Sequence, residues 1–341
     1  MVGSYNDIED TLWDDSDGRS WRQTVANLRH RYCLLFLTSG VLRCESLHKA
    51  DLSDHLAFYL PQREQDIHPM LMLIMQIPEG KVNNGRVLYG RATQHKLPQF
   101  CPVGVLAFYL QCRFEVTKEF DEYTVTDWCT NSTWFDIKLL VDVNGSDRTL
   151  PMTSDSYSRH IKEVLVKHGL PTDNLCHLGR KLGAKTLELL EEESEDIRRM
   201  GQWNPSVFDN HYSTKLPIGS IRKLSGYISK SNVYFNTRTT VEPSAELLYS
   251  TPMGYWVYSA YEDVMEKAKL EGGGYETAIH FLRCLVELNK IFIQDAAALL
   301  VHKEDRHNHS MYRNLDCLES DLFQVSNTEP WRLHPNDPSS L

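Results

Sequence analysis

The stretch Cys176-His177-Leu178-Gly179-Arg180-Lys181-Leu182-Gly183-Ala184 places an imidazole three residues before a guanidinium. Its composition predicts a helix from His177 to about Glu188. At 3.6 residues per turn, positions three apart project from one face of a helix. An imidazole transfers protons near neutral pH, and a guanidinium holds a phosphate with two parallel hydrogen bonds. The stretch therefore predicts a face that binds and acts on a phosphodiester.

The rest of the chain offers the other groups that tyrosine attack on DNA requires. Such attack needs two guanidinium groups on the non-bridging oxygens, an imidazole, an ammonium for the leaving oxygen and a phenol as nucleophile. The candidate set, in chain order, is Arg43, Lys81, His177, Arg180, Trp203 and Tyr212. Each has an ordinary structural alternative. Arg43 alone would pair on a helix, Lys81 would be a solvated turn residue, Trp203 is more often packing, and Tyr212 is equally often structural.

The charge distribution favours a basic face between acidic ends. The 341-residue chain has a net charge of −10. Residues 1–18 hold six acids and no base, and residues 241–341 hold sixteen acids and eight bases, which leaves +4 on residues 19–240. This pattern is compatible with DNA contact, although a mixed solvated surface explains the charge equally well. The candidate DNA-binding residues are Arg43, Lys81, Arg86, Arg91, Lys96, Arg180, Lys181, Arg198, Arg199, Lys215, Arg222 and Lys223.

Composition excludes several other classes of protein. The eight cysteines include no C-x-x-C pair, which argues against a zinc ribbon and a secreted disulfide scaffold. His302, His307 and His309 lack the spacing of a metal site, so no metal and no cofactor is expected. No apolar run reaches the ~20 residues of a membrane-spanning helix, and no membrane contact is expected.

The apolar periodicity predicts a mainly helical protein with a small antiparallel sheet, an α+β fold. Expected helices cover 21–40, 41–47, 102–114, 155–168, 177–188, 197–203, 255–270 and 275–302. Expected strands cover 71–77 and 86–92, joined as a hairpin with Lys81 near its tip. Residues 137–143 fit either a strand or a buried helical turn. Gly219, Gly226 and Asn232 mark loops.

The same pattern predicts a division of the chain into four parts. These are an acidic lead-in over 1–18, a DNA-binding domain over 19–240, a helical C-terminal extension over 241–310 and a loop-like tail over 311–341. In the helix over 275–302, apolar residues at 3-4 spacing fit either a dimerising seam or burial in the core, and burial is the favoured interpretation because several faces are apolar.

Two boxes resemble those of the tyrosine recombinases. Ser39-Gly40-Val41-Leu42-Arg43 through Asp54 resembles their first arginine box, and His177-Leu178-Gly179-Arg180 resembles their H-x-x-R box. Gly80-Lys81, Cys101-Pro102-Val103-Gly104 and the stretch after His177 are most similar to the fungal centromere DNA-binding proteins. That family includes the largest subunit of the CBF3 complex, whose recombinase-like second domain is the part that matches. Crypton-type transposon recombinases are relatives.

The resemblance implies a fold like the recombinase catalytic domain and a nuclear centromere or kinetochore protein that grips double-stranded DNA without cutting it. The sequence departs from the family's pattern in two ways. The position at which the family carries a second histidine falls on Gln202 or Trp203, depending on a one-residue shift. The arm-like domain that normally precedes the catalytic domain and closes around the duplex has no room before residue 20. Two alternatives stay open. One is an active recombinase in which Tyr212 forms a 3′-phosphotyrosyl link. The other is an interaction module whose acidic C-terminal helices mediate self-association or bind protein partners.

Overall fold

The computed structural model describes residues 20–64, 66–77, 87–142, 145, 147–169, 174–203, 216–228, 233–302, 312, 314–319 and 323. The α-helices are α2 (Trp21–Ser39), α3 (Glu45–His48), α4 (Pro102–Thr117), α5 (Glu119–Tyr123), α6 (Ser154–Lys167), α7 (Leu178–Leu189), α8 (Ser194–Met200), α10 (Ile218–Leu224), α11 (Ala245–Tyr249), α12 (Gly254–Glu271), α13 (Glu276–His302) and α15 (Asp316–Glu319). Short 3-10 turns are η1 (Leu52–Asp54), η2 (Pro98–Phe100), η3 (Asn131–Thr133), η4 (Leu175–His177) and η5 (Thr237–Thr240). The strands are β1 (His55–Leu60), β2 (Met70–Ile77) and β3 (Leu88–Thr93).

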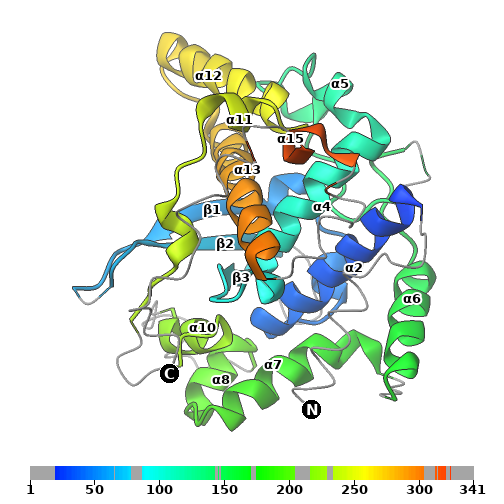
Figure 1. The fold of residues 1–341 in the computed structure, drawn as a ribbon, viewed down its shortest axis with the longest axis vertical. Coiled ribbons are helices and arrows are strands. Elements are labelled where there is room, and N and C mark those ends of the chain that lie inside the picture. Colours follow the sequence, from blue (N-terminus) through cyan, green and yellow to red (C-terminus); the bar gives the residue numbers. More distant parts are fainter. Residues whose placement is uncertain are drawn as a thin grey trace.

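Three long helices, α2, α4 and α13, form the centre of the molecule (Figure 1). Helix α2 starts where the Ser20 side chain accepts a hydrogen bond from the Gln23 backbone at 3.3 Å, and it is buried on nearly every face. Helix α4 starts with Pro102, which suits a first helical position because that position needs no backbone donor. Phe108 of α4 meets Phe292 of α13 edge to face, with ring centroids 5.4 Å apart. The mainly helical fold expected from the sequence is confirmed.

The small sheet is antiparallel, in the order β1-β2-β3. The register pairs His55 with Met75 and Ile77 with Leu88. The predicted strands 71–77 and 86–92 are therefore confirmed as neighbours, and Lys81 falls in the part of the chain outside the described residues. Strand β1 was not predicted. Its exposed Phe58 and Tyr59 break the alternation of apolar and polar residues by which a half-buried strand is identified.

Helix α7 packs directly against α2, and two glycines of the quoted stretch allow the contact. A Cβ on Gly183 would lie 2.2 Å from the carbonyl oxygen of Thr38, and one on Gly179 would lie 2.5 Å from the Cβ of Leu37. Real Cβ atoms do not approach other atoms so closely, so both positions require glycine. The stretch that carries Arg180 thus also determines how α7 sits on α2.

Several local expectations need correction. His177 is the last residue of η4 and the N-cap of α7, so the helix begins at Leu178. Residues 137–142 form neither a strand nor a helix, because they pair only at single bridges, Asp51 with Lys138 and Val141 with Pro151. Gly219 lies inside α10, whereas Gly226 is in a loop with φ +85°.

The C-terminal extension shares the main hydrophobic core. Helix α13 packs on α4 and β1, and its 3-4 stripe, including Leu282, Ile293 and Ala296, is buried within the chain. The stripe therefore belongs to the core rather than to a dimerising seam. The described part of 311–341 is also not loop-like, because α15 forms and Leu318 and Phe323 are buried. Within the described helices, none combines the length and apolar character that a membrane crossing requires.

Candidate nucleic-acid interface

An open groove of about 800 Å³ lies between α7, α8 and the segment after α2. It is lined by Arg43, His177, Arg180, Lys181, Ala184, Lys185, Glu188, Ser194, Ile197, Arg198 and Trp203. Of the predicted site residues, Arg43, His177, Arg180, Lys181 and Arg198 thus line this groove, together with Trp203. Arg43 comes from a position 134 residues before His177, so only folding brings them together.

Arg43 reaches the groove because the chain turns sharply after α2. Gly40 caps the helix, and Val41 adopts a left-handed backbone with φ 54°. The backbone N–H of Leu42 then donates to the carbonyl of Leu37 at 2.8 Å, which fixes the turn. Arg43 follows, half-buried, and its Nε is a buried donor without a hydrogen-bond acceptor. Among the described residues, no carboxylate forms an ion pair with Arg43.

Arg180 is held against the same turn from the other side. Its Nε donates to the carbonyl of Val41 at 3.1 Å, and its guanidinium carbon lies 5.7 Å from the ring centroid of Trp203. Burial lowers the pKa of Arg180 to about 10, and the positive charge of Arg43 acts in the same direction. Two guanidiniums are therefore close together without a neutralising carboxylate among the described residues. Such a pair favours binding of an anion, because the anion relieves both the repulsion and the desolvation.

The turn that carries His177 is tied to the Arg43 segment by the backbone. The N–H of Cys44 donates to the carbonyl of Cys176 at 3.0 Å. The first turn of α7, with its unpaired N–H groups and positive dipole end, starts beside these residues. Exposed Lys181 follows one residue after Arg180. The groove therefore combines positive charge, backbone donors and an imidazole, which is the set of groups that a phosphodiester requires.

Trp203 has a packing role that the structure makes visible. Its ring lies under the Arg180 guanidinium and against Gly201, where a Cβ would come within 2.9 Å of the ring. The turn before it is held by Gln202, whose backbone has φ 53° and whose side chain donates to the carbonyl of Tyr89 at 2.7 Å. Gln202, one of the two residues that fall at the family's second histidine position, thus anchors the groove wall to β3.

The other described residues that were predicted to contact DNA are half-buried or paired with carboxylates, and of these Arg198 lines the groove. Arg91 is half-buried on β3, where burial lowers its pKa, and Lys96 is half-buried after the same strand. Arg198 pairs with Glu195, and Arg199 lies 3.5 Å from both Glu195 and Asp196. Lys223 pairs with Glu192 at 2.7 Å.

Arg222 needs a correction, because it is 2% exposed and forms two hydrogen bonds to Asp66, at 2.8 and 2.5 Å. Its guanidinium is used inside the protein, so we leave it out of the DNA-contacting set. Arg238, one of the bases counted in residues 19–240, is likewise buried, against Asp295 at 2.6 Å. The five described bases between residues 197 and 240 are thus all paired with carboxylates, which reduces the positive charge that they offer to DNA. Lys81, Arg86, Tyr212 and Lys215 lie outside the described residues.

Sequence reasoning missed the two features that build the groove. One is the close contact of Gly179 and Gly183 with α2, for which the only signal was glycine repeated every fourth residue in a helix. The other is the Val41 carbonyl, which accepts a hydrogen bond from the Nε–H of Arg180. A backbone acceptor leaves no signal in a sequence.

The chain is similar to a known protein family and to several solved structures. A family model described as "Centromere DNA-binding protein complex CBF3 subunit, domain 2" matches residues 14–318. Among solved structures, the complex of a Flpe point mutant with a DNA Holliday junction is similar, with a TM-score of 0.45, 11% identity and coverage of 87% of this chain and 63% of that one. The Flpe–Holliday junction complex has a TM-score of 0.43, 12% identity and the same two coverages. The FLP recombinase–Holliday junction complex I has a TM-score of 0.41, 12% identity and coverage of 69% and 49%.

The chain thus spans less than two thirds of the length of these recombinase chains. The comparison with curated proteins found no match.

Proposed function

The chain belongs to the family of the centromere DNA-binding protein complex CBF3 subunit, domain 2, and from this premise we propose that it binds double-stranded DNA through the phosphate backbone at the Arg43–Arg180 groove. The observation that carries the proposal is the pair of neighbouring guanidiniums without a carboxylate partner among the described residues. A DNA phosphate placed between them accepts charge-assisted hydrogen bonds from both.

The proposed contact set is smaller than the set expected from the sequence. Arg43, Arg180 and Lys181 contact phosphate, and His177 and the first turn of α7 contact the same or the next phosphate. Lys96 and Arg91 extend the surface along β3. Lys81, Arg86 and Lys215 stay in the set as proposals from the sequence. The family's name supports action at centromeric DNA, and on that ground we place the protein in the nucleus, in a kinetochore assembly.

Duplex binding of the wild type and Arg180→Ala, measured by fluorescence anisotropy over a salt series, tests this proposal. We expect the variant to bind about tenfold more weakly, and the slope of log affinity against log salt to fall by about 0.9 for the lost phosphate contact. Arg159→Ala is the matched control, because Arg159 is exposed on α6 and is not a groove residue. Equal binding by wild type and Arg180→Ala would remove the groove from the interface.

We propose that DNA binding does not require strand cleavage. The alternative, an active recombinase, stays open because Arg43, His177 and Arg180 line one groove, as phosphoryl transfer by Tyr212 would need. A nicked duplex that traps a covalent intermediate separates the two. No adduct is expected from the wild type. An adduct that disappears in Tyr212→Phe and persists in Tyr89→Phe would establish cleavage.

The third alternative is an interaction module formed by the acidic C-terminal helices. Burial of the α13 stripe inside the chain weakens it, because that stripe was the surface proposed for self-association. Exposed residues such as Tyr255 and Leu270 on α12 remain as a surface for protein partners. Loss of duplex binding even at low salt, in a protein with normal stability, would favour this alternative.

A further inference from the structure

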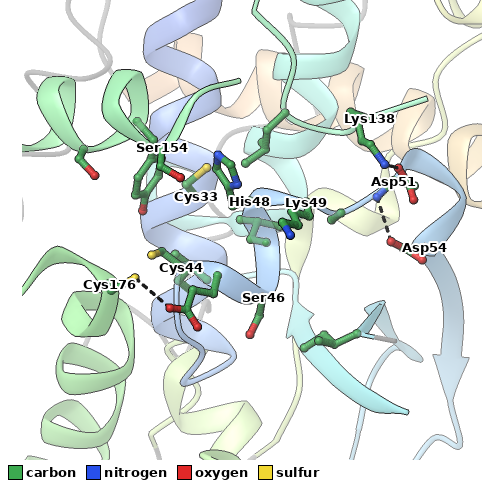
Figure 2. Close-up of a pocket in the computed structure, with 18 of the residues that line it drawn as sticks. Cys33, Cys44, Ser46, His48, Lys49, Asp51, Asp54, Lys138, Ser154 and Cys176 are labelled. Carbon is green, nitrogen blue, oxygen red and sulfur yellow. Dashed lines mark hydrogen bonds and ion pairs between the residues drawn. The ribbon is translucent and has the colours of Figure 1, made fainter. Parts of the chain in front are cut away.

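A second hollow, of about 710 Å³, is lined by residues 44–51, which directly follow Arg43 (residues 41–44 are called the Arg43 segment below). It shares no lining residue with the groove. Its wall includes Cys33, Cys44 and Cys176, together with Ser46, His48, Lys49 and Lys138 (Figure 2). Figure 2 shows the side chains of Cys44 and Cys176 next to each other on this wall, where α3 meets the turn before α7. The hollow gives small solutes a route to both sulfur atoms.

The two cysteines are in contact through both backbone and side chain. The Cys44 N–H donates to the Cys176 carbonyl at 3.0 Å, and the Cys176 thiol is close enough to the Cys44 thiol to raise its pKa. One backbone hydrogen bond between two residues brings their Cα atoms into the range of roughly 4.4–6.8 Å that a disulfide requires. The Cys176 thiol also points to the Glu45 carboxylate, with the sulfur 4.0 Å from Oε1.

We propose that Cys44 and Cys176 form a reversible dithiol–disulfide site that fastens the Arg43 segment to the turn carrying His177. With a peroxide as oxidant, the Cys176 thiol is oxidised to a sulfenic acid, and one water is released. The Cys44 sulfur then attacks the Cys176 sulfur, the S–S bond forms, the S–O bond breaks, and a second water is released. A dithiol reductant reduces the bond back to the two thiols by thiol–disulfide exchange and itself becomes a disulfide.

The chemistry assigns different roles to the two sulfurs. Burial, and then the hydrogen bond with Cys176, raise the pKa of Cys44, which disfavours its thiolate. Cys44 is therefore a poor nucleophile toward free peroxide, and its attack on the oxidised Cys176 sulfur depends on that sulfur being held beside it. The other described cysteines do not compete equally: Cys33, Cys101, Cys112, Cys284 and Cys317 are buried, and Cys129 lines a different hollow, beside Trp128.

The position of the pair gives the bond a consequence for the groove. Arg43 directly precedes Cys44, and His177 directly follows Cys176, so the disulfide would join the two groove segments through adjacent residues. The covalent link closes a loop of more than 100 residues and restricts the unfolded chain. It also reduces the ordering that these segments undergo on binding. This last consequence rests on the proposed DNA binding, whereas the disulfide itself does not.

The test treats the full chain with hydrogen peroxide, blocks the remaining thiols with iodoacetamide, digests the protein without reductant and analyses it by mass spectrometry. We expect a peptide pair linked through Cys44 and Cys176, lost after dithiothreitol treatment. Cys129→Ser should keep the link, and Cys176→Ser should abolish it. A Cys33–Cys44 link, or oxidation of Cys129 with no link at 44 and 176, would overturn the proposal.

Two further readouts use the wild-type chain and do not depend on the folding of any variant. The oxidised protein should melt on the order of 5 °C higher than the reduced protein, and an unchanged or lower melting temperature of the linked species would contradict the proposed geometry. The oxidised protein should also bind duplex DNA about twofold to fivefold more tightly than the reduced protein. A link without DNA binding in either redox state contradicts the proposed function only; DNA binding without a link contradicts the disulfide only.

Discussion

At the scale of single residues, burial determines which ionisable groups keep their charge. Arg180 is half-buried and close to Arg43, and its pKa falls to about 10, yet it stays protonated at neutral pH. The same desolvation acts on histidine with a different result. Burial lowers the pKa of His55 to about 4, and the backbone of Asp51 only partly opposes this shift. Neutral His55 accepts or donates a hydrogen bond with the Tyr32 hydroxyl at 3.1 Å.

The lowered pKa of His55 predicts a pH dependence of stability. Below pH 6.5 the unfolded chain binds a proton at His55 that the folded protein does not bind, so the contribution of His55 to stability is full at pH 7 and is lost as pH falls toward 4. From these two pKa values the loss is about 2 kcal/mol at pH 5. We expect His55→Gln to cost stability at pH 7, and the cost to shrink by about that amount at pH 5.

Urea denaturation of the two proteins at both pH values measures this difference. Comparing variant with wild type removes the contributions of other groups, including Asp54, whose pKa is raised to about 6 by burial and which therefore acts in the opposite direction. A cost for His55→Gln that is the same at pH 7 and pH 5 would show that His55 titrates normally in the folded protein.

At the scale of elements, the close contact between α7 and α2 positions the groove. Gly183 and Gly179 bring α7 so near to α2 that Arg180 reaches the Val41 carbonyl beyond the end of α2. A larger residue at either position would push the helices apart. The separation would change the distance between Arg180 and Arg43, because Arg43 follows α2 directly.

Gly183→Ala therefore tests whether helix contact controls the site. The added Cβ meets the Thr38 carbonyl oxygen, and we expect a loss of about 1–3 kcal/mol in the free energy of unfolding together with weaker duplex binding. Gly219→Ala in α10 is the matched control. There the nearest atom to the new Cβ is Glu192 Oε1 at 3.7 Å, so we expect no loss and a gain of up to about 1 kcal/mol. Similar effects of the two substitutions on unfolding would argue against the close contact.

At the scale of the whole molecule, the C-terminal helices and the N-terminal two thirds of the chain are connected through a buried ion pair. The Arg238 guanidinium donates to Asp295 of α13 at 2.6 Å and to the carbonyls of Lys96 and His95 at 2.7 and 2.8 Å. The neighbouring charge of Asp295 raises the pKa of Arg238 despite burial. The predicted boundary at 240 thus falls between segments that share a core.

Asp295→Ala should destabilise the whole chain, because it leaves the Arg238 charge buried and without its carboxylate. Removal of one partner of a buried pair typically costs about 3–5 kcal/mol. Circular dichroism and tryptophan fluorescence should both report one unfolding transition at the same lowered temperature. Glu242→Ala is a suitable control, because its pair with Lys290 is exposed and contributes at most about 1 kcal/mol. Separate transitions for the two probes would indicate two independent domains.

The sequence by itself determined the long helices, the β2–β3 pair and the short stretches that carry Arg43, His177 and Arg180, because periodicity and turn residues are local signals. Helix α6 begins at Ser154, one residue before the expected start, and α4 begins at Pro102, as expected. The charge arithmetic was less informative, because it counts bases without their partners. Arg222 was counted as a surface base, and its partner Asp66 lies 156 residues earlier in the chain.

Only the tertiary structure decided which of these residues meet. It placed Arg43 beside Arg180 in one groove, put Arg222 and Arg238 inside the protein, and brought Cys44 to Cys176. Each of these outcomes depends on contacts between residues far apart in the chain, and such contacts form only when α7 and α13 pack on α2 and α4. The physical reason is that desolvation and pairing of a charge depend on its three-dimensional neighbours, whereas local patterns specify only the element that carries it.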